Sequence, residues 1–154
     1  MIPVAIALGS NLGDRERCLR DALAALSPFL SGIRASTFYE TDPVGVGEQP
    51  RFLNAAAIGH TTLPAHALLA RLLEIERQHG RERPHPGAAR TLDLDLILYG
   101  DVLIDEPGLA VPHPRFRERT FVLEPLAEIA GEWVDPVTRT SVRELFTTIK
   151  KAGP

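Results

Sequence analysis

The strongest constraint on how this chain can fold is a stretch of alternating leucine and aspartate at residues 92–96. It reads Leu-Asp-Leu-Asp-Leu and runs on through apolar residues to Tyr99. Because side chains alternate between the two faces of a strand, the pattern predicts a β-strand over 92–99 with all its leucines, Leu98 included, on one face. Asp93 and Asp95 then project together from the other face.

Two carboxylates side by side on an apolar strand need compensation. Charges about 7 Å apart there are unfavourable unless cations or hydrogen-bond donors neutralise them. Mg²⁺ does this well, because it takes one or two carboxylates and completes its octahedron with water and substrate phosphates. A solvated strand face is the ordinary explanation for a lone Asp-x-Asp. Here the pair follows an arginine-rich segment, so Asp93 and Asp95 are predicted to bind magnesium beside a nucleoside triphosphate.

The side chains that could bind the phosphates come mainly from two arginine-rich segments, 81–90 and 115–119. The chain contains no Gly-x-x-x-x-Gly-Lys-Ser/Thr sequence and no dinucleotide fingerprint, so side chains have to hold the phosphates. The candidates are Arg81, Arg83, Arg90 and Arg119, with His113 as a further donor. Each arginine taken singly is an ordinary surface residue, and the group is selected by its position near the aspartates.

A second candidate site begins at Phe52. Asn54 lies two positions further along an apolar segment, which places an aromatic ring and an amide on one strand face. A ring stacks on a flat ligand, and an amide both donates to and accepts from the edge of a pterin or purine. A core phenylalanine beside a strand-end asparagine is the simpler explanation, so the pair alone is weak evidence.

Hydrophobic periodicity predicts the order strand, helix, strand, strand, helix, strand. The expected elements are a first strand to Leu8 with a turn at 9–14, a helix carrying Leu19 to Leu26, strands at 33–39 and 52–62, a helix from Pro64 to near Gly80, the strand at 92–99 with a short strand at 102–104 paired to it, and helices at 121–130 and 142–150. This order predicts an α+β, ferredoxin-like fold, an antiparallel sheet with helices packed on its faces. Residues 41–50 and 81–89, rich in proline and glycine, are expected to form long mobile active-site loops.

Composition favours a single domain in a reducing compartment. A chain of 154 residues with 44% hydrophobic content fits one core. The net charge of −3 argues against a nonspecific nucleic-acid binder, and the apolar N-terminal run is too short to span a membrane. Cys18 is the single cysteine and no signal peptide is recognisable, so we expect a cytoplasmic location.

Four segments, correctly ordered between residues 7 and 130, carry a family resemblance. They are Leu8–Asp14, Thr41–Gly45 leading to Gln49–Ala56, Arg90–Asp95, and Val111–His113 with Arg119–Phe121. Together they resemble the 6-hydroxymethyl-7,8-dihydropterin pyrophosphokinase family. Any one segment would only be suggestive, whereas four in the right order and spacing leave little room for coincidence.

The resemblance implies a pyrophosphokinase domain over 1–154 that transfers pyrophosphate from ATP to the hydroxymethyl group of 6-hydroxymethyl-7,8-dihydropterin in folate biosynthesis and releases AMP. It implies two Mg²⁺ ions on Asp93 and Asp95. The implied pterin pocket consists of Thr41, Val44, Phe52, Asn54 and Phe121, and the implied ATP site consists of Arg81, Arg83, Arg90, His113 and Arg119. Arg81, Arg90, Asp93 and Asp95 are the implied catalytic residues, while the turn at 9–11 is expected to be mainly structural.

Two other classes of function stay open. A catalytically silent pterin- or nucleotide-binding module would have the same pocket, and the loop containing Pro86–Ala89, about one residue shorter than in enterobacterial members, favours it. An RNA-binding ferredoxin-like domain would interleave aromatic and basic residues on the sheet face, where this sheet has paired aspartates. We expect a monomer that binds ATP and the hydroxymethyldihydropterin, with no nucleic-acid or membrane partner, and that is open to contact with other folate-pathway enzymes.

Overall fold

The computed structural model describes residues 1–42, 51–79 and 91–152. The elements in chain order are β1 (Ile2–Ser10), α1 (Arg15–Leu26), β2 (Ser31–Ala35), β3 (Tyr39–Thr41), β4 (Phe52–Thr61), α2 (Ala65–Gln78), β5 (Asp93–Tyr99), β6 (Ile104–Glu106), β7 (Leu109–Val111), the 3₁₀ turn η1 (Phe116–Glu118), α3 (Thr120–Ala130) and α4 (Val142–Ala152). None of the helices in these described ranges is long and apolar enough to cross a bilayer.

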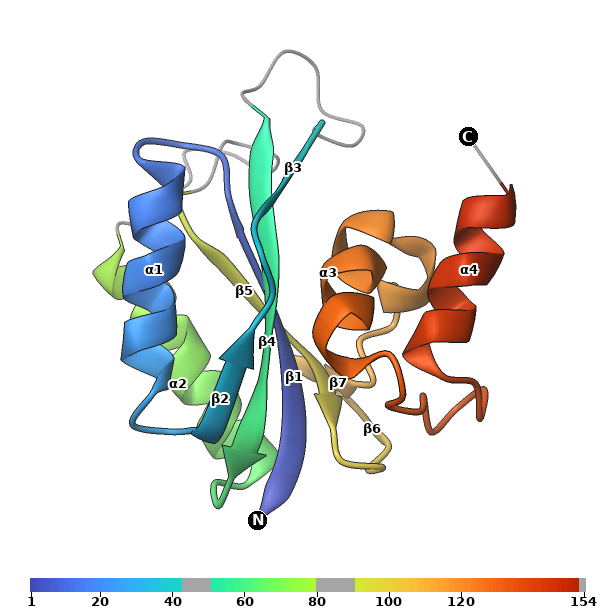
Figure 1. Cartoon of the computed structure of the whole chain (residues 1–154). Helices are drawn as coiled ribbons and strands as arrows, with labels where there is room; N and C mark the ends of the chain where they lie inside the picture. Colours follow the sequence, from blue (N-terminus) through green and yellow to red (C-terminus); the bar gives the residue numbers. More distant parts are fainter. Residues whose placement is uncertain (43–50, 80–90, 153–154) are drawn as a thin grey trace.

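The main sheet is antiparallel, in the order β2-β4-β1-β5, and β3 pairs with the other end of β4. Helices α1 and α2 cover one face, and α3 and α4 stand on the other (Figure 1). The predicted α+β, ferredoxin-like arrangement is therefore confirmed.

The central strand β1 separates two hydrophobic layers. Ile6 and Leu8 pack into the layer of α1 and α2, whereas Ala5 and Ala7 face the layer of α3 and α4. Large side chains therefore fill the first layer, while β1 presents only small ones to the second.

A β-bulge on β5 reverses the faces of its second half. Between Ala5 and Ile6 the register of β1 with β5 shifts, which leaves Ile97 as an extra residue on β5. Up to Leu96 the leucines pack toward α1 and α2, but Leu98 packs into the layer of α3. The prediction that all the leucines share one face was wrong for Leu98, because the extra residue breaks the two-residue period.

The single strand predicted over 33–39 is interrupted after Ala35. Ser36 donates its backbone N–H to the Ala56 carbonyl at 2.8 Å, and its hydroxyl accepts from the Ala56 N–H at 2.9 Å. A side-chain oxygen thus takes the place of a backbone carbonyl in the ladder. The chain leaves the regular strand there and returns to the sheet as β3, at Tyr39.

The prediction that a short strand at 102–104 pairs with β5 was also wrong. Ile104–Glu106 forms a hairpin with Leu109–Val111 instead, through Gly108 at φ +85°. A tight turn in which the Val102 N–H donates to the Tyr99 carbonyl at 3.1 Å ends β5 and directs the chain away from the main sheet.

A buried carboxylate organises the connection between α3 and α4. Asp135 has no exposed surface, and it accepts hydrogen bonds from Nε and Nη2 of Arg117, from the Val137 N–H at 3.0 Å and from Thr138 Oγ1 at 2.8 Å. Burial raises the pKa of Asp135, but these donors, led by Arg117, outweigh it and lower the pKa to about 2. The carboxylate is therefore charged at all ordinary pH values.

Replacing Asp135→Asn is expected to lower the free energy of unfolding at neutral pH by about 2 to 4 kcal/mol, because Arg117 loses its charged partner. A group with a folded pKa of about 2 contributes stability above its unfolded pKa of 3.8 and loses it as the pH falls through the folded value. Denaturant titrations should therefore show the difference between wild type and variant shrinking from about pH 4 toward pH 2. A constant difference over that range would contradict this account.

Candidate functional site

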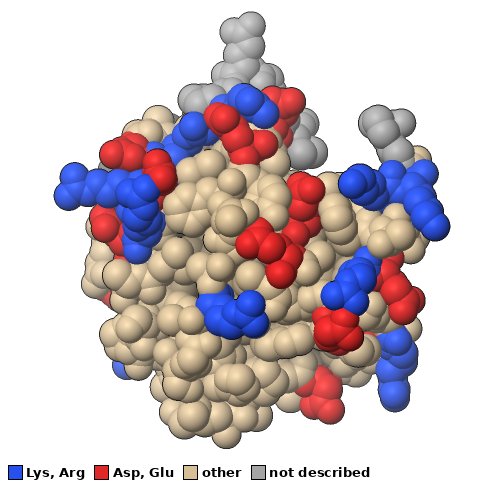
Figure 2. Space-filling view, in the orientation of Figure 1, with Lys and Arg blue, Asp and Glu red and all other residues tan. Residues whose placement is uncertain are grey.

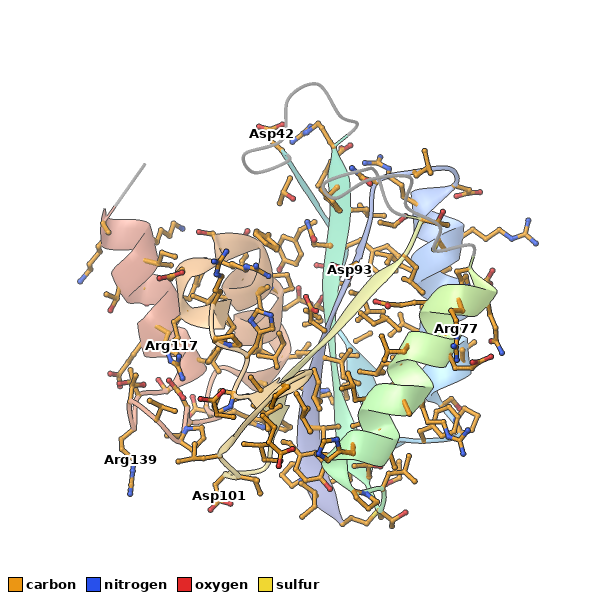
Figure 3. All side chains as sticks on the ribbon, turned by 180° about the vertical axis from the view of Figure 1, so that it is seen from behind. Asp42, Arg77, Asp93, Asp101, Arg117 and Arg139 are labelled. Atoms are coloured by element: carbon orange, nitrogen blue, oxygen red, sulfur yellow. The ribbon has the colours of Figure 1, made fainter. Side chains whose placement is uncertain are left out.

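The two aspartates of β5 lie on the sheet face opposite α1 and α2. Asp93 is paired with Gly9 of β1, and Asp95 with Ala7. Both carboxylate residues are half-buried. Figure 3 shows Asp93 in the half of the molecule that also carries Asp42 at the end of β3. We call the face defined by Asp93, Asp95, Gly9, Asn54 and Phe52 the site face.

Gly9 lies between the acidic pair and the predicted binding site for a flat ligand at Phe52 and Asn54. We call that site the slot. Gly9 is the strand neighbour of both Asp93 on β5 and Asn54 on β4, so the backbones of those two residues stand about 10 Å apart. A Cβ at Gly9 would lie 3.2 Å from Asn54 Oδ1 and 3.7 Å from Phe52 Cδ1. The missing side chain leaves room there. The turn predicted from Gly9 begins two residues later, because Gly9 and Ser10 belong to β1.

The predicted slot residues on β3 and β4 come together. Asn54 is buried, and its Nδ2 donates to Thr41 Oγ1 at 2.5 Å. Its Oδ1 lies toward Gly9, beside the Phe52 ring. Thr41 therefore fixes the orientation of the amide, and the half-buried Phe52 ring stands next to it.

His113 is held by the bulge of β5. Its backbone N–H donates to the Ile97 carbonyl at 2.9 Å, and its Nδ1 accepts from the Arg115 N–H at 3.1 Å. The proton of the neutral ring therefore sits on Nε2. Burial lowers the pKa of His113 and the Arg119 charge lowers it further, while Asp93 opposes them. Both charges thus act on the imidazole, which is neutral near pH 7.

Arg119 and Phe121 meet at the start of α3. Arg119 occupies the N-cap position, and its guanidinium carbon lies 5.6 Å from the centroid of the Phe121 ring. Phe121 is half-buried against the apolar layer under α3. The structure thus brings a cation and an aromatic ring together on the first turn of α3. The charge of the same Arg119 also lowers the pKa of His113.

Four of the predicted site residues, Val44, Arg81, Arg83 and Arg90, lie outside the described residues. Within the described part of the chain, no group of three or more His, Cys, Asp or Glu side chains could hold a metal ion. The acidic pair on β5 is a two-carboxylate set. That set suits Mg²⁺, which draws few ligands from the protein and the rest from water and phosphate oxygens.

Glu128 of α3 helps to hold the site in place, and the sequence did not predict this role. It accepts hydrogen bonds from the Thr37 N–H at 3.0 Å, from Thr37 Oγ1 at 2.8 Å and from the Tyr39 hydroxyl at 2.6 Å. Burial raises the pKa of Glu128, but these hydrogen bonds outweigh it and lower the pKa. The contact ties β3, which carries Thr41, to α3. No sequence spacing signals it, since Thr37 and Glu128 are 91 residues apart.

A second missed anchor is Arg15 at the start of α1. Its Nη1 donates to the Glu40 carboxylate at 2.9 Å and to the Arg51 carbonyl at 2.8 Å. Arg51 in turn pairs with Asp42 at 3.1 Å. These contacts join the ends of β3 and β4 that carry Thr41 and Phe52.

Figure 2 shows basic and acidic side chains mixed over the upper and right-hand parts of the surface. Most of the lower left part carries no charged side chains. A nucleic-acid-binding domain would gather its basic residues on one face or stripe. Among the described residues, the face shown has no such basic area, and the site face bears carboxylates instead.

Comparisons with known proteins agree on one family. The family model described as 7,8-dihydro-6-hydroxymethylpterin-pyrophosphokinase (HPPK) matches residues 5–131. The 2-amino-4-hydroxy-6-hydroxymethyldihydropteridine pyrophosphokinase of Bacillus subtilis is 48% identical, over 82% of this chain and 77% of its own length. The Haemophilus influenzae protein of the same name is 41% identical, over 88% of this chain and 86% of its own length.

Other relatives are longer proteins. The folic acid synthesis protein fol1 of Pneumocystis carinii is 40% identical over 95% of this chain, which spans 20% of it. This chain also spans 24% of a mitochondrial folate synthesis bifunctional protein of Arabidopsis thaliana that is 47% identical. A crystal structure of Plasmodium falciparum HPPK-DHPS superposes with a TM-score of 0.79, at 15% identity, over 96% of this chain and 45% of that one. That likeness shows the shared fold.

The family model covers most of the chain, and the two bacterial relatives are 48% and 41% identical to it over more than four fifths of its length. The predicted family is therefore confirmed. This chain belongs to the 7,8-dihydro-6-hydroxymethylpterin-pyrophosphokinase family.

Proposed function

We propose that this domain transfers the pyrophosphate group of ATP to the hydroxymethyl oxygen of 6-hydroxymethyl-7,8-dihydropterin and releases AMP. One observation carries the proposal. On the site face, the carboxylates of Asp93 and Asp95 stand across Gly9 from the Asn54 amide and the Phe52 ring. A metal-triphosphate site and a slot for a flat ring then share one surface, so the two substrates can meet there.

Asp93 and Asp95 are the proposed magnesium ligands. We propose two ions, as the family resemblance implies, with the remaining ligands supplied by water and phosphate oxygens. When bound, such ions neutralise the triphosphate and orient it for in-line displacement. The apolar strand around the carboxylates keeps them on a rigid element, with Leu94 buried between them.

The pterin slot is proposed to use Asn54, Thr41 and the two aromatic rings. Thr41 holds the Asn54 amide in one orientation, and an amide can pair with both a donor and an acceptor on the pterin edge. Phe52 and Phe121 would stack on the two faces of the ring. Val44 completes the proposed pocket.

The triphosphate is proposed to lie against His113 and Arg119. Because Nδ1 of His113 accepts a backbone hydrogen bond, its Nε2–H is the donor left for a phosphate oxygen. Arg119 supplies a permanent positive charge. Arg81, Arg83 and Arg90 are proposed as further phosphate ligands, with Arg81 and Arg90 also catalytic.

The transfer itself is an attack by the pterin hydroxyl oxygen on the β-phosphorus of ATP. A new oxygen–phosphorus bond forms, the bond from the β-phosphorus to the bridging oxygen of AMP breaks with its electron pair leaving on AMP, and the hydroxyl proton is released to water. Such a reaction depends mainly on positioning and charge neutralisation. The site face offers both without a covalent nucleophile.

We propose a single domain over 1–154 that works as a monomer in the cytoplasm. The bifunctional names of relatives such as the Arabidopsis thaliana protein support contact with other enzymes of folate synthesis. Light scattering on the purified chain would test the monomer directly.

The acidic pair gives the first test. With ATP, Mg²⁺ and hydroxymethyldihydropterin, Asp93→Asn and Asp95→Asn are each expected to lower turnover by about a thousandfold, because the metal loses a charged ligand. Pterin affinity should change by less than about threefold, since neither carboxylate belongs to the slot. Chromatography of AMP and pterin diphosphate measures the turnover. Asp101→Asn, in the exposed turn after β5 (Figure 3), is the matched control.

Near-normal turnover in both site variants would reject the assignment of the metal. A wild-type protein that binds the substrates but forms no AMP would be a silent binding module instead.

The aromatic slot gives the second test. Phe52→Ala is expected to weaken pterin binding by about 1 kcal/mol beyond the burial lost, because the stacking partner is gone. Affinity for Mg-ATP should stay the same. Fluorescence titration of the pterin measures the dissociation constant, with Phe146→Ala on α4 as a control for the loss of an aromatic elsewhere. An unchanged dissociation constant for Phe52→Ala would remove that residue from the slot.

The third test fills the space at Gly9. A valine fits a strand, but its Cβ would lie 3.2 Å from Asn54 Oδ1 and its methyl groups would enter the slot. Gly9→Val is expected to raise the KM for the pterin about tenfold, the cost of overpacking a tight site, and Gly9→Ala to raise it less. Thermal unfolding checks that the fold is kept. A folded valine variant with a normal KM would show that the slot lies elsewhere.

A further inference from the structure

The segment from His113 to Arg119 carries two proposed phosphate ligands, yet it has little regular structure of its own. Its middle is the single 3₁₀ turn η1 (Phe116–Glu118). Within it, the Glu118 N–H donates to the Arg115 carbonyl at 3.0 Å, and the Arg119 N–H to the Phe116 carbonyl at 3.3 Å. One 3₁₀ turn is too short and too weakly bonded to fix the direction of a side chain at its end. The segment therefore depends on anchors outside itself.

Two of these anchors are already evident. The His113 N–H is bonded to the bulge carbonyl of Ile97, which fixes the start of the segment. The Phe116 ring is fully buried in the layer under α3 and α4, which fixes its middle. Neither contact reaches the far end of the segment, where the backbone is held by α3, since the Val122 and Leu123 N–H groups both donate to the Arg119 carbonyl at 3.0 Å.

The third anchor is the ion pair of Arg117 with Asp135. The guanidinium meets the carboxylate as a fork, with Nη2 at 2.9 Å from Oδ1 and Nε bonded to Oδ2. The Asp135 side chain is fully buried and that of Arg117 is 24% exposed. Such a bidentate pair fixes both the position and the plane of the guanidinium.

Asp135 is itself immobilised by the loop around it. Its carboxylate accepts from the Val137 N–H and from Thr138 Oγ1. Its backbone N–H donates to the Thr140 carbonyl at 2.9 Å, and a bridge between Val134 and Ser141 closes the loop. Arg117 is therefore tied to a rigid point on the connection between α3 and α4.

Arg117 does not itself belong to the site. In Figure 3 it lies on the side of α3 and α4, well separated from Asp93 on β5. The shortest covalent route from Arg117 to the site runs along the backbone of η1 to Arg119, two residues away.

We propose that the Arg117–Asp135 pair is a positioning device that holds Arg119 in the orientation in which it binds the triphosphate of ATP. This inference rests on the proposed function, in which Arg119 is a phosphate ligand. The pair acts on the nucleotide side of the reaction and leaves the pterin slot, built on β3 and β4, unaffected. A pair that only stabilised the fold would affect both substrates alike.

The test compares the KM for ATP with the KM for the pterin. It uses variants that keep both charges of the Arg117–Asp135 pair but change the geometry of their contact. Arg117→Lys replaces the fork by a single ammonium, and Asp135→Glu moves the carboxylate by one methylene. Each is expected to raise the KM for ATP about tenfold and to change the KM for the pterin by less than about twofold. Two variants are used so that one that folds poorly leaves the other to decide. Arg143→Lys, which alters the exposed Arg143–Glu132 pair of the same layer, should change neither value.

The second arm asks whether the effect passes through Arg119. In an Arg119→Ala background, adding Arg117→Lys is expected to change the KM for ATP by less than about twofold, because there is no guanidinium left to misplace. An undiminished effect in that background overturns the proposal, and so does an equal rise of both KM values in the single variants.

The outcome separates this proposal from the proposed function. A wild type that forms AMP, with variants whose KM for ATP is normal, overturns the positioning role and leaves the function standing. A wild type that forms no AMP overturns the function. In that case the dissociation constants of Mg-ATP are compared between the wild type and the same variants. They still decide whether the Arg117–Asp135 pair controls nucleotide binding.

Discussion

The pairing of two carboxylates on one face of β5 is the constraint on which the rest of the site depends. Asp93 and Asp95 are half-buried on a strand whose other face is packed with leucine. Charge in that position has to be compensated. The neighbouring strand β1 places two small residues, Gly9 and Ala7, beside the carboxylates, which leaves space for the proposed cation and substrate. The chemistry of the site therefore follows from which side chains are absent as much as from which are present.

The second requirement is that the two proposed substrate sites stay at a fixed distance from each other. The sheet sets this, because β1 links Asp93 directly to Asn54 through Gly9. Contacts outside the sheet hold the remaining parts: the bulge carbonyl of Ile97 holds His113, and Glu128 ties β3 to α3. A rigid sheet with separately anchored walls suits a transfer whose catalysis is mostly positioning.

The sequence predicted the sheet and its helices because their hydrophobic periods are long and regular. It failed where one residue changes the geometry. The extra residue at Ile97 moved Leu98 to the other face, and the Ser36 hydroxyl interrupted a strand. The Asp93 and Asp95 pair was visible because its spacing is local, whereas the anchors at Glu128 and Asp135 join distant parts of the chain and leave no local pattern. The roles of the arginines in 81–90 stay predictions, since those residues lie outside the described part.

The central claim is that the metal site and the pterin slot share one surface. Mn²⁺ in place of Mg²⁺, bound with a nonhydrolysable ATP analogue, broadens the proton resonances of nearby groups. The account predicts strong broadening of the pterin hydroxymethyl protons, since the two sites lie about 10 Å apart or closer, and loss of that broadening in Asp95→Asn. Sharp hydroxymethyl resonances in the wild-type complex with both ligands bound would contradict it.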